Sequence, residues 1–312
     1  MAHPPASVCI FAPTPLLTVT IEATVDGRDD LHLHPGGQGF WVARMVQSLG
    51  ITPALCVPLG GETGSVLRRL LMDMSIEVNA VDVTGPSGSY IHDRRGGERR
   101  ELFRSEIAHL GRHELDELYT ATLAAGIAAG VCVLTGTQEQ RVLDPDTYRR
   151  LAKDLSANDV RVVADLSGDL LRAALEGGVH LLKISSDELV RDGWAKEDAS
   201  DAIVEGVRKL RAEGAQDVVV TRAEHDSIAG VDQRWFRIRT PAMDVVEHRG
   251  AGDSVTAGLA VALRTGLDVE ASLRLSAAAG ALNVTRHGLG SGRADAIRQL
   301  ASNVEVRAME AP

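Results

Sequence analysis

Cysteine, positive charge and long apolar segments are scarce in this sequence, and each absence excludes a class of protein. Three cysteines are too few, and odd in number, for a disulfide framework, and their spacing fits no metal site. They lie in short apolar segments, so we expect small buried side chains in a reducing compartment: Cys9, Cys56 and Cys132. The formal net charge of −10 repels nucleic acid and anionic membranes, so neither is expected as a partner.

Signals for export or membrane insertion are also missing. No apolar segment approaches the ~20 residues that cross a bilayer, and residues 1–7 lack the charged and then apolar pattern of a signal peptide. We therefore expect a cytoplasmic protein. Of the 312 residues, 44% are hydrophobic, which is enough for one large core. Because the chain has no repeat, no low-complexity linker and no break in composition, residues 1–312 are predicted to form a single domain.

Helices and strands are predicted to alternate from residue 113 onward. The hydrophobic pattern favours a helix and then a strand four times over, at 113–128 and 131–135, 145–156 and 160–165, 168–176 and 179–184, and 198–213 and 217–222. Such alternation implies right-handed βαβ crossovers, and hence an α/β fold whose mostly parallel sheet is flanked by helices on both faces. Two short strands then precede the helices at 251–265 and 268–285, which close the pattern.

The N-terminal third departs from this alternation. Its polar segment 22–35 is expected to form a loop or a short strand pair that leaves the main sheet. Short strands near 88–93 and 98–104 are separated by residues 94–97 (RRGG), which are typical of a hairpin turn. We therefore predict a small β lid made from segments 22–35 and 85–104.

The strongest local feature is the run Arg249-Gly-Ala-Gly-Asp-Ser254, which leads directly into an apolar helix. Small residues at a helix start leave backbone N–H groups uncovered, and these groups bind anions together with the helix dipole. Asp253 stands beside the same spot. Phosphoryl transfer needs both parts, because donors stabilise the transferring group and a carboxylate takes the proton of the attacking hydroxyl. Two alternatives are a tight turn that Asp253 merely caps, and a serine hydrolase built on Ser254.

Other glycine-rich segments carry less information. Residues 60–65 (GGETGS) lack the lysine that a phosphate loop has before its hydroxyl residue, and they are predicted to be a loop and a helix start. Residues 35–39 (PGGQG) open the first helix, which is predicted at 38–48. The sequence has neither a dinucleotide-binding fingerprint after its first strand nor a His-Glu-x-x-His zinc motif.

Two glycine-rich helix starts, at 36–39 and 250–253, together resemble the ribokinase-like carbohydrate kinase superfamily, and its phosphofructokinase B-type branch in particular. Four further segments are similar to motifs of that branch: 13–18 (PTPLLT), 164–168 (ADLSG), 183–189 (KISSDEL) and 281–288 (ALNVTRHG). The resemblance extends over almost the whole chain. It implies a doubly wound α/β fold, a β lid that often serves as a homodimer interface, ATP as donor and Mg²⁺ as the required metal.

The resemblance also implies roles for individual residues. Asp253 would be the catalytic base, with the N–H groups of Gly250, Ala251 and Gly252 as the anion hole. On the nucleotide side, Lys183 would lie near the phosphates, Glu188 would act on the magnesium, and Thr221 and Asn283 would lie near the nucleotide. The substrate-binding candidates are Thr18, Gly36, Gly37, Gln38, Trp41 and Arg94.

Departures from the family pattern cluster in the acceptor pocket. Thr18 replaces an Asp that holds sugar hydroxyls, Gln38 a Lys that faces the substrate phosphate, and Trp41 an Asn that contacts the sugar. Tyr90 falls near the place of a phosphate-binding Arg, Ser185 replaces the Asn of the magnesium motif, and residues 221–226 replace a glycine-containing nucleotide loop. Arg94 and Arg95 could supply another anion site or simply form a solvated turn.

These observations predict an ATP-dependent kinase that phosphorylates an alcohol group of a small sugar or sugar phosphate. The changed pocket disfavours a sugar phosphate, because a site built for one phosphate rejects analogues whose polar groups stay unmatched. A nucleoside acceptor is an alternative, since Trp41 could stack on a ring. A pseudokinase that only binds nucleotide or sugar is another, because the magnesium and nucleotide motifs are altered.

Overall fold

The computed structural model describes residues 7–136, 142–223, 225–247, 249–286 and 289–310. Most strands belong to a ten-stranded sheet in the order β14-β13-β12-β11-β10-β9-β8-β1-β4-β5. The bounds of these strands are β1 Ser7–Phe11, β4 Thr52–Gly60, β5 Glu77–Val83, β8 Val131–Thr135, β9 Arg161–Asp165, β10 Val179–Ser185, β11 Ala215–Thr221, β12 Ser227–Val231, β13 Arg234–Arg239 and β14 Glu305–Met309.

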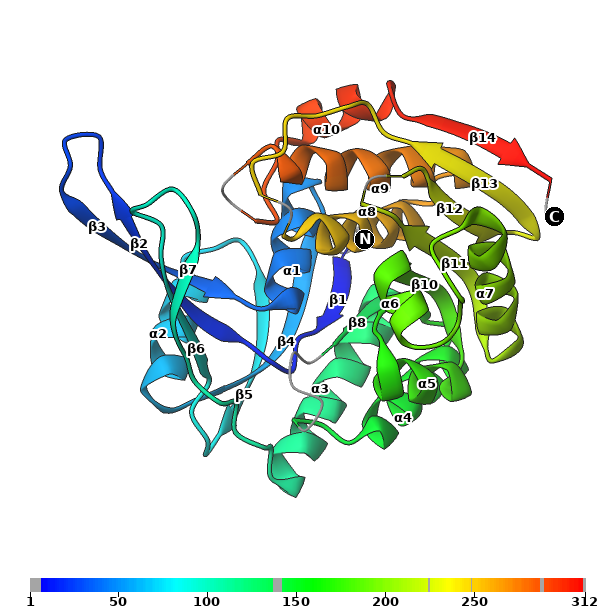
Figure 1. Cartoon of the computed structure of the whole chain (residues 1–312). Coiled ribbons are helices and arrows are strands. Elements are labelled where there is room, and N and C mark those ends of the chain that lie inside the picture. The colour runs from blue at the N-terminus through cyan, green and yellow to red at the C-terminus, as the bar shows by residue number, and fades with distance from the viewer. Residues whose placement is uncertain (1–6, 137–141, 224, 248, 287–288, 311–312) are drawn as a thin grey trace, which may run out of the picture.

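Every neighbouring pair from β11 to β5 is parallel, whereas β12, β13 and β14 add to one edge as antiparallel strands. The chain winds from β1 through β4 to β5 in one direction and from β8 through β9 and β10 to β11 in the other (Figure 1). The order reverses between β1 and β8, and ligands of open α/β sheets bind outside the carboxyl ends of the strands at such a point. The predicted doubly wound fold is confirmed.

Helices cover both faces of the sheet (Figure 1). Their bounds are α1 Gln38–Ser48, α2 Gly61–Met72, α3 Arg112–Ala129, α4 Pro145–Ala157, α5 Gly168–Gly177, α6 Ser186–Arg191, α7 Ser200–Ala212, α8 Ala251–Thr265, α9 Val269–Val284 and α10 Ala294–Ala301. Strand β1 shows how the two cores share the sheet. Its Val8 and Ile10 pack with α1, α8 and α9, whereas Cys9 and Phe11 pack with the layer of α3, α4, α5 and α7. Successive strand residues face opposite sides, so a sheet buried on both faces needs such continuous apolar strands.

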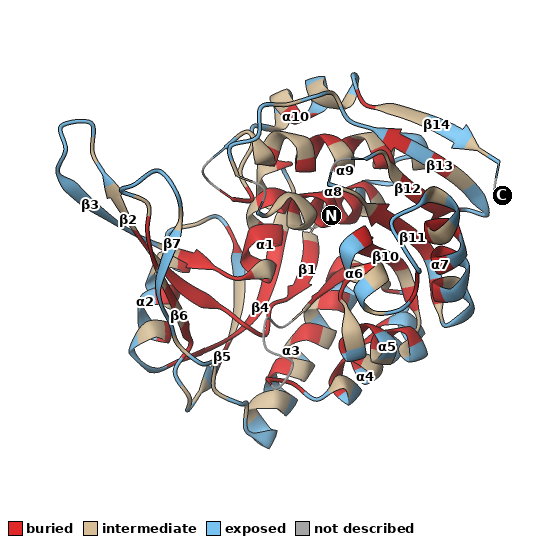
Figure 2. Ribbon diagram, in the orientation of Figure 1, coloured by how far each residue is buried: buried red, intermediate tan, exposed pale blue. Residues whose placement is uncertain are grey.

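A separate four-stranded sheet, in the order β3-β2-β6-β7, forms the predicted small β lid. Its strands are β2 Leu16–Ala23, β3 Asp29–Gly36, β6 Gly88–Asp93 and β7 Arg100–Arg104. The segment 22–35 is mostly a strand that pairs with β2 along its whole length. Figure 2 shows that the lid is buried near the main sheet and exposed toward its tip.

The sequence pattern predicted that the helix ending near residue 285 is the last element, and this is wrong. A short helix, α10, and the edge strand β14 follow it. Strand β14 has only five residues, carries charged residues at alternate positions and has no fully buried position, so its apolar signal is weak. The predicted buried thiols are confirmed, since Cys9, Cys56 and Cys132 are all free and buried. No helix within the described ranges combines the length and apolarity that a membrane crossing requires.

Candidate active site

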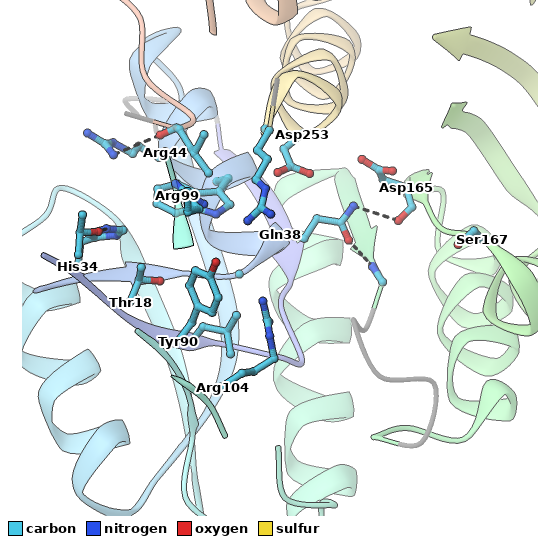
Figure 3. A pocket seen from close by; sticks show the side chains of 18 of the residues that line it. Thr18, His34, Gln38, Arg44, Tyr90, Arg99, Arg104, Asp165, Ser167 and Asp253 are labelled. Carbon is cyan, nitrogen blue, oxygen red and sulfur yellow. Dashed lines mark hydrogen bonds between the residues drawn. The ribbon is translucent and has the colours of Figure 1, made fainter. Parts of the chain in front are cut away.

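A cavity of about 1050 Å³ lies between the inner face of the lid and the carboxyl ends of the central strands (Figure 3). It therefore lies at the point where the strand order reverses. Eight of the residues selected from the sequence line it: Thr18, Gly37, Gln38, Trp41, Arg94, Glu188, Gly250 and Asp253. Segments that are distant in the sequence thus meet around one space.

The turn before α8 has the geometry of an anion-binding helix start. Gly250 caps the helix with φ 74° and ψ 0°, in the left-handed region that glycine adopts without strain. The helix begins at Ala251, so the N–H groups of the following residues point out of its first turn. Asp253 lies in that turn and lines the cavity. A carboxylate and a cluster of donors therefore share one end of the cavity.

Asp253 belongs to a buried group of charges. Lys183 Nζ lies 3.2 Å from Asp165 Oδ1, and the two side chains are 7% and 5% exposed. The other carboxylate oxygen of Asp165 accepts a hydrogen bond of 2.6 Å from Thr256 Oγ1, on α8. Asp165 thus ties Lys183, at the end of β10, to the helix that carries Asp253.

The environment of Asp253 holds its carboxyl group near the point of half-ionisation at neutral pH. Burial, and secondarily the charge of Asp165, raise the pKa of Asp253 to about 7. Lys183 and the Gln38 amide act in the opposite direction. For Lys183, burial alone would lower the pKa of the ammonium, but Asp165, Glu188 and Asp253 raise it above its ordinary value. A carboxylate with a pKa near the working pH is suited to act as a general base.

Gly252 leaves room for Lys183 at the anion-binding turn. A Cβ added at Gly252 would lie 2.4 Å from Lys183 Nζ. The ammonium group therefore rests against the backbone of the turn itself. Any side chain at position 252 would displace the charge that a bound phosphate at this helix start would meet.

Glu188 faces the cavity from the first turn of α6. Its Oε2 atom accepts hydrogen bonds from Ser185 N (3.0 Å) and Ser185 Oγ (2.7 Å). The bond from Ser185 N forms a capping box together with the bond from Glu188 N to Ser185 Oγ (3.2 Å). No group of three or more His, Cys, Asp or Glu side chains among the described residues could hold a metal ion. Mg²⁺ is commonly held by one or two carboxylates together with waters and substrate phosphates, so Glu188 fits the role of a partial ligand.

Arginines line much of the cavity, and all but Arg94 were missed by the sequence analysis. The others are Arg44 on α1, Arg99 and Arg104 near the lid hairpin, Arg191 on α6, and Arg249 before the glycine turn. Arg94 and Arg99 each lie 3.6 Å from Glu247 Oε2. The buried Arg99 Nε atom has no hydrogen-bond partner within the described part of the chain. Arg104 stacks over the Tyr90 ring, with 4.4 Å from its Cζ atom to the ring centroid.

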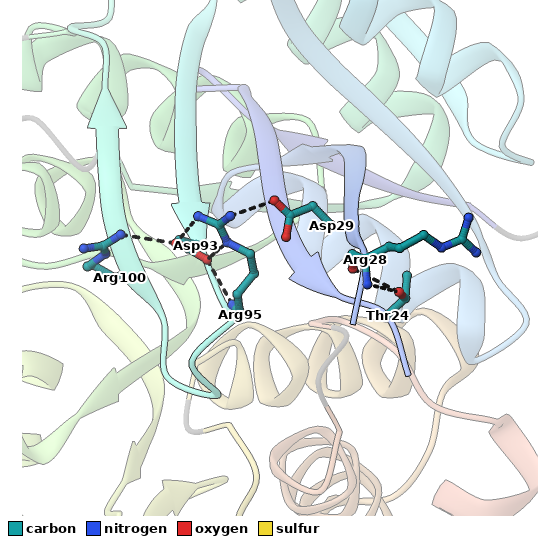
Figure 4. Close-up of polar contacts among 6 residues, drawn as sticks. All are labelled: Thr24, Arg28, Asp29, Asp93, Arg95 and Arg100. Carbon is teal, nitrogen blue, oxygen red and sulfur yellow. Dashed lines mark hydrogen bonds and ion pairs between the residues drawn. The ribbon is translucent and has the colours of Figure 1, made fainter. Parts of the chain in front are cut away.

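The pair Arg94–Arg95 divides into two different environments. Arg95 donates from Nε to Asp93 Oδ1 at 3.0 Å and from Nη1 to Asp29 Oδ2 at 2.7 Å, which ties the hairpin to β3 (Figure 4). Arg100 also donates to Asp93. Arg94 instead turns to the cavity, where its side chain is 10% exposed. The solvated-turn interpretation therefore describes Arg95, and the anion-site interpretation remains for Arg94.

Some of the selected residues lie outside the cavity lining. Asn283 is fully buried, and its side chain bonds to Arg249 O and Gly290 N at 2.8 Å each. It thus holds the residue just before the glycine turn. Gly36 packs against Thr18, and Thr221 ends β11. Ala251, Gly252 and Lys183 lie immediately behind the lining, around the turn.

Comparison with known proteins decides the family. A family model described as pfkB family carbohydrate kinase matches residues 17–296, which include most of the lid and of the central sheet and the glycine turn. The chain belongs to this family.

Three further likenesses agree with this membership of the pfkB family. The chain is 27% identical to 1-phosphofructokinase of Bacillus subtilis (strain 168) over 276 residues, which are 88% of each protein. A crystal structure of phosphofructokinase-2 from Escherichia coli in complex with potassium superposes with a TM-score of 0.84 at 22% identity, over 96% of this chain and 99% of that one. The fold is also that of Arabidopsis thaliana ribokinase complexed with ribose and ATP, with a TM-score of 0.73 at 20% identity over 95% and 98%.

Membership of the pfkB family confirms the predicted class of enzyme, a carbohydrate kinase, and implies the use of ATP. The arginines, in contrast, were missed although part of the signal was present. Gln38, Trp41 and Arg44 recur at a spacing of three, which places them along one side of α1. Arg249 directly precedes the glycine turn. For Arg99 and Arg104 the sequence gives no such signal, because their approach to the cavity depends on how the lid folds over it.

Proposed function

We propose that this pfkB family kinase transfers the γ-phosphoryl group of ATP to an alcohol group of a sugar phosphate, with Asp253 as the general base. The observation that carries the proposal is the position of Asp253. Its carboxyl, whose pKa burial raises to about 7, lies in the first turn of α8, in a cavity whose other side is lined by arginines. ADP release from MgATP across a panel of sugars, sugar phosphates and nucleosides tests it. A cytoplasmic location stays a prediction.

The mechanism follows from the charges around the turn. The acceptor hydroxyl lies against Asp253, which takes its proton as the oxygen attacks the γ-phosphorus in line. The N–H groups of Ala251 and Gly252, with the positive end of the α8 dipole, stabilise the charge on the transferring group. Lys183 stays protonated beside Asp165 and adds a fixed positive charge at the turn. Glu188 would help to hold a Mg²⁺ ion, which neutralises charge on the nucleotide phosphates.

The arginines favour an acceptor that already carries a phosphate. Guanidinium groups match phosphate oxygens with paired donors, and such bonds are stronger than neutral ones. The lid side of the cavity offers Arg94, Arg99 and Arg104, and the donor at Arg99 Nε has no partner within the described residues. The sequence disfavoured a sugar phosphate because Thr18, Gln38 and Trp41 replace an Asp, a Lys and an Asn of the family pattern. These guanidinium groups supply the positive charge from other positions, so we prefer a sugar phosphate to a nucleoside.

Replacing Arg99 with Ala is expected to raise the KM for a sugar phosphate while leaving kcat within a fewfold. The loss of charge-assisted hydrogen bonds, each worth roughly 1.5–3 kcal/mol, corresponds to about tenfold to a hundredfold in KM. Steady-state kinetics with phosphorylated and unphosphorylated forms of one hexose measure the effect, which should be confined to the phosphorylated form. Arg100→Ala is the matched control, because Arg100 is 73% exposed and pairs with Asp93. An unchanged KM in Arg99→Ala would exclude this phosphate site.

The outer face of the lid favours a homodimer. Residues that alternate with the cavity-facing ones form an apolar surface across paired strands: Val19, Ile21, Leu31, Leu33, Ile91 and Phe103. Leu31 and Phe103 are more than half exposed. A twofold interface uses the same patch on both subunits, so a continuous apolar sheet face can pair with a second copy of itself.

A charge in this surface should separate the two copies. Leu31→Glu is expected to convert a dimer to a monomer, because a carboxylate buried in an apolar interface loses its hydration. Light scattering after size exclusion measures the mass. Leu267→Glu, at an exposed leucine before α9, is the control. A wild-type chain that stays monomeric at all concentrations, or a Leu31→Glu variant that stays dimeric, contradicts an interface at this face.

A further inference from the structure

Gln38, the first residue of α1, uses its side-chain amide within the protein. Its Oε1 atom accepts a hydrogen bond of 2.8 Å from Gly136 N, just after β8. Its Nε2 atom donates to Asp165 O, at the end of β9, over 3.4 Å. Figure 3 shows the amide between these two strand ends, with Asp253 close by. Gln38 therefore connects the carboxyl ends of two neighbouring strands at the inner wall of the cavity.

The orientation of the amide is fixed by its partners. Gly136 N–H can only donate, so the atom that faces it must be the amide oxygen. The NH₂ group then points to the opposite side, where it donates one hydrogen to Asp165 O over 3.4 Å. Figure 3 shows the Asp253 carboxylate near the same amide, and both side chains line the cavity. The second hydrogen is therefore available to the Asp253 carboxylate.

We propose that Gln38 is a positioning residue for the base, which holds the Asp253 carboxylate toward the acceptor through its NH₂ group. This inference rests on the proposed role of Asp253 and assigns Gln38 a place behind the reacting atoms. It differs from the role expected from the sequence, in which Gln38 would contact the substrate. With its oxygen held by Gly136 N and one N–H by Asp165 O, the amide has little capacity left for a substrate phosphate.

The neighbours of Asp253 predict how Gln38 variants should behave. Asp165 on β9 and Glu188 on α6 raise the pKa of Asp253, whereas Lys183 on β10 and Gln38 on α1 lower it, and burial is the largest cause of the rise to about 7. A neutral donor at position 38 is therefore one of two groups that favour the charged form. A positive charge at this position should lower the pKa of Asp253, and a negative charge should raise it.

Two variants with opposite charge test the inference. In Gln38→Lys, the ammonium is expected to favour the Asp253 carboxylate and to move the acid limb of the kcat/KM profile about one pH unit or more below its wild-type position near 7. In Gln38→Glu, which keeps an acceptor for Gly136 N, a second carboxylate should move the limb upward by a similar amount. Gln47→Lys adds the same charge on the same helix outside the cavity lining, and its profile should match the wild type.

A direct titration separates this inference from the proposed function. The carboxyl resonances of ¹³C-labelled aspartates report the ionisation of Asp253 without turnover, and Asp253→Asn identifies its signal. Opposite shifts in Gln38→Lys and Gln38→Glu support the role of Gln38 even if no acceptor is phosphorylated. A signal of Asp253 that titrates as in the wild type in both folded variants overturns it. Loss of activity in both variants, with that titration unchanged, would indicate a purely structural residue and would also overturn it.

Discussion

Replacing Asp253 with Asn is expected to lower turnover by at least about a hundredfold while the protein stays folded and binds nucleotide. The amide has the shape of the carboxyl group but cannot take a proton from the acceptor hydroxyl. Because burial already holds the carboxyl of Asp253 near half-ionisation at neutral pH, replacing it with a neutral group should not destabilise the site. The measurement is ADP release from MgATP with the acceptor that the wild type uses.

The control for this substitution is Asp244→Asn. Asp244 is an exposed acid on the segment that leads to the glycine turn, so the same chemical change there should leave turnover near the wild-type rate. A thermal shift with MgATP shows whether Asp253→Asn still binds nucleotide. Turnover within a fewfold of wild type in Asp253→Asn would disprove the assignment of the base. Absence of both nucleotide binding and turnover in the wild type would favour the pseudokinase alternative.

Replacing Lys183 with Met is expected to lower the free energy of unfolding by about 3–5 kcal/mol, because removal of one partner leaves a buried carboxylate uncompensated. Asp165 is 5% exposed and lies 3.2 Å from Lys183 Nζ. Methionine keeps the length of the aliphatic chain, so the loss reports the charge more than the packing. The variant should also be inactive near neutral pH, since loss of the ammonium raises the pKa of Asp253 further and keeps the base protonated.

A double variant isolates the electrostatic part of this loss in the free energy of unfolding. Adding Asp165→Asn to Lys183→Met removes the stranded charge and keeps an acceptor for Thr256 Oγ1, so much of the lost stability should return. Urea unfolding of the wild type, both single variants and the double variant completes the cycle. A loss below about 1 kcal/mol in Lys183→Met, or a double variant less stable than either single one, contradicts a buried ion pair that supports the fold.

Elements with strong periodic signals could be predicted from the sequence, and the groups that depend on tertiary approach could not. The helix over 251–265 and the strand at 131–135 agree with the structure because their apolar patterns are continuous. The edge strand β14 was missed because it is only five residues long and has no fully buried position. At the site, the glycine turn can be recognised from its own residues, because its backbone conformation requires glycine at Gly250.

The arginines on the lid side of the cavity are an example of residues that local sequence motifs do not indicate. The replacement of a family Lys by Gln38 suggested a lost positive charge, whereas Arg99 and Arg104 bring charge to the cavity from the hairpin of the lid. Glu247 lies 3.6 Å from both Arg94 and Arg99, yet it is distant from both in the sequence. No periodicity or motif relates these residues, because only the folded lid brings them together.

The two sheets contribute different groups of residues to the cavity, so each group can change without the other. The main sheet and its helices carry Asp253, Lys183 and Asp165, whereas the lid carries Arg94, Arg99 and Arg104. With the proposed roles of these residues, changes in the lid would alter which acceptor is bound while the groups that transfer the phosphoryl group stay unchanged. Proteins that share this architecture would then acquire new acceptors through substitutions in a small sheet, without any change in the core of the main domain.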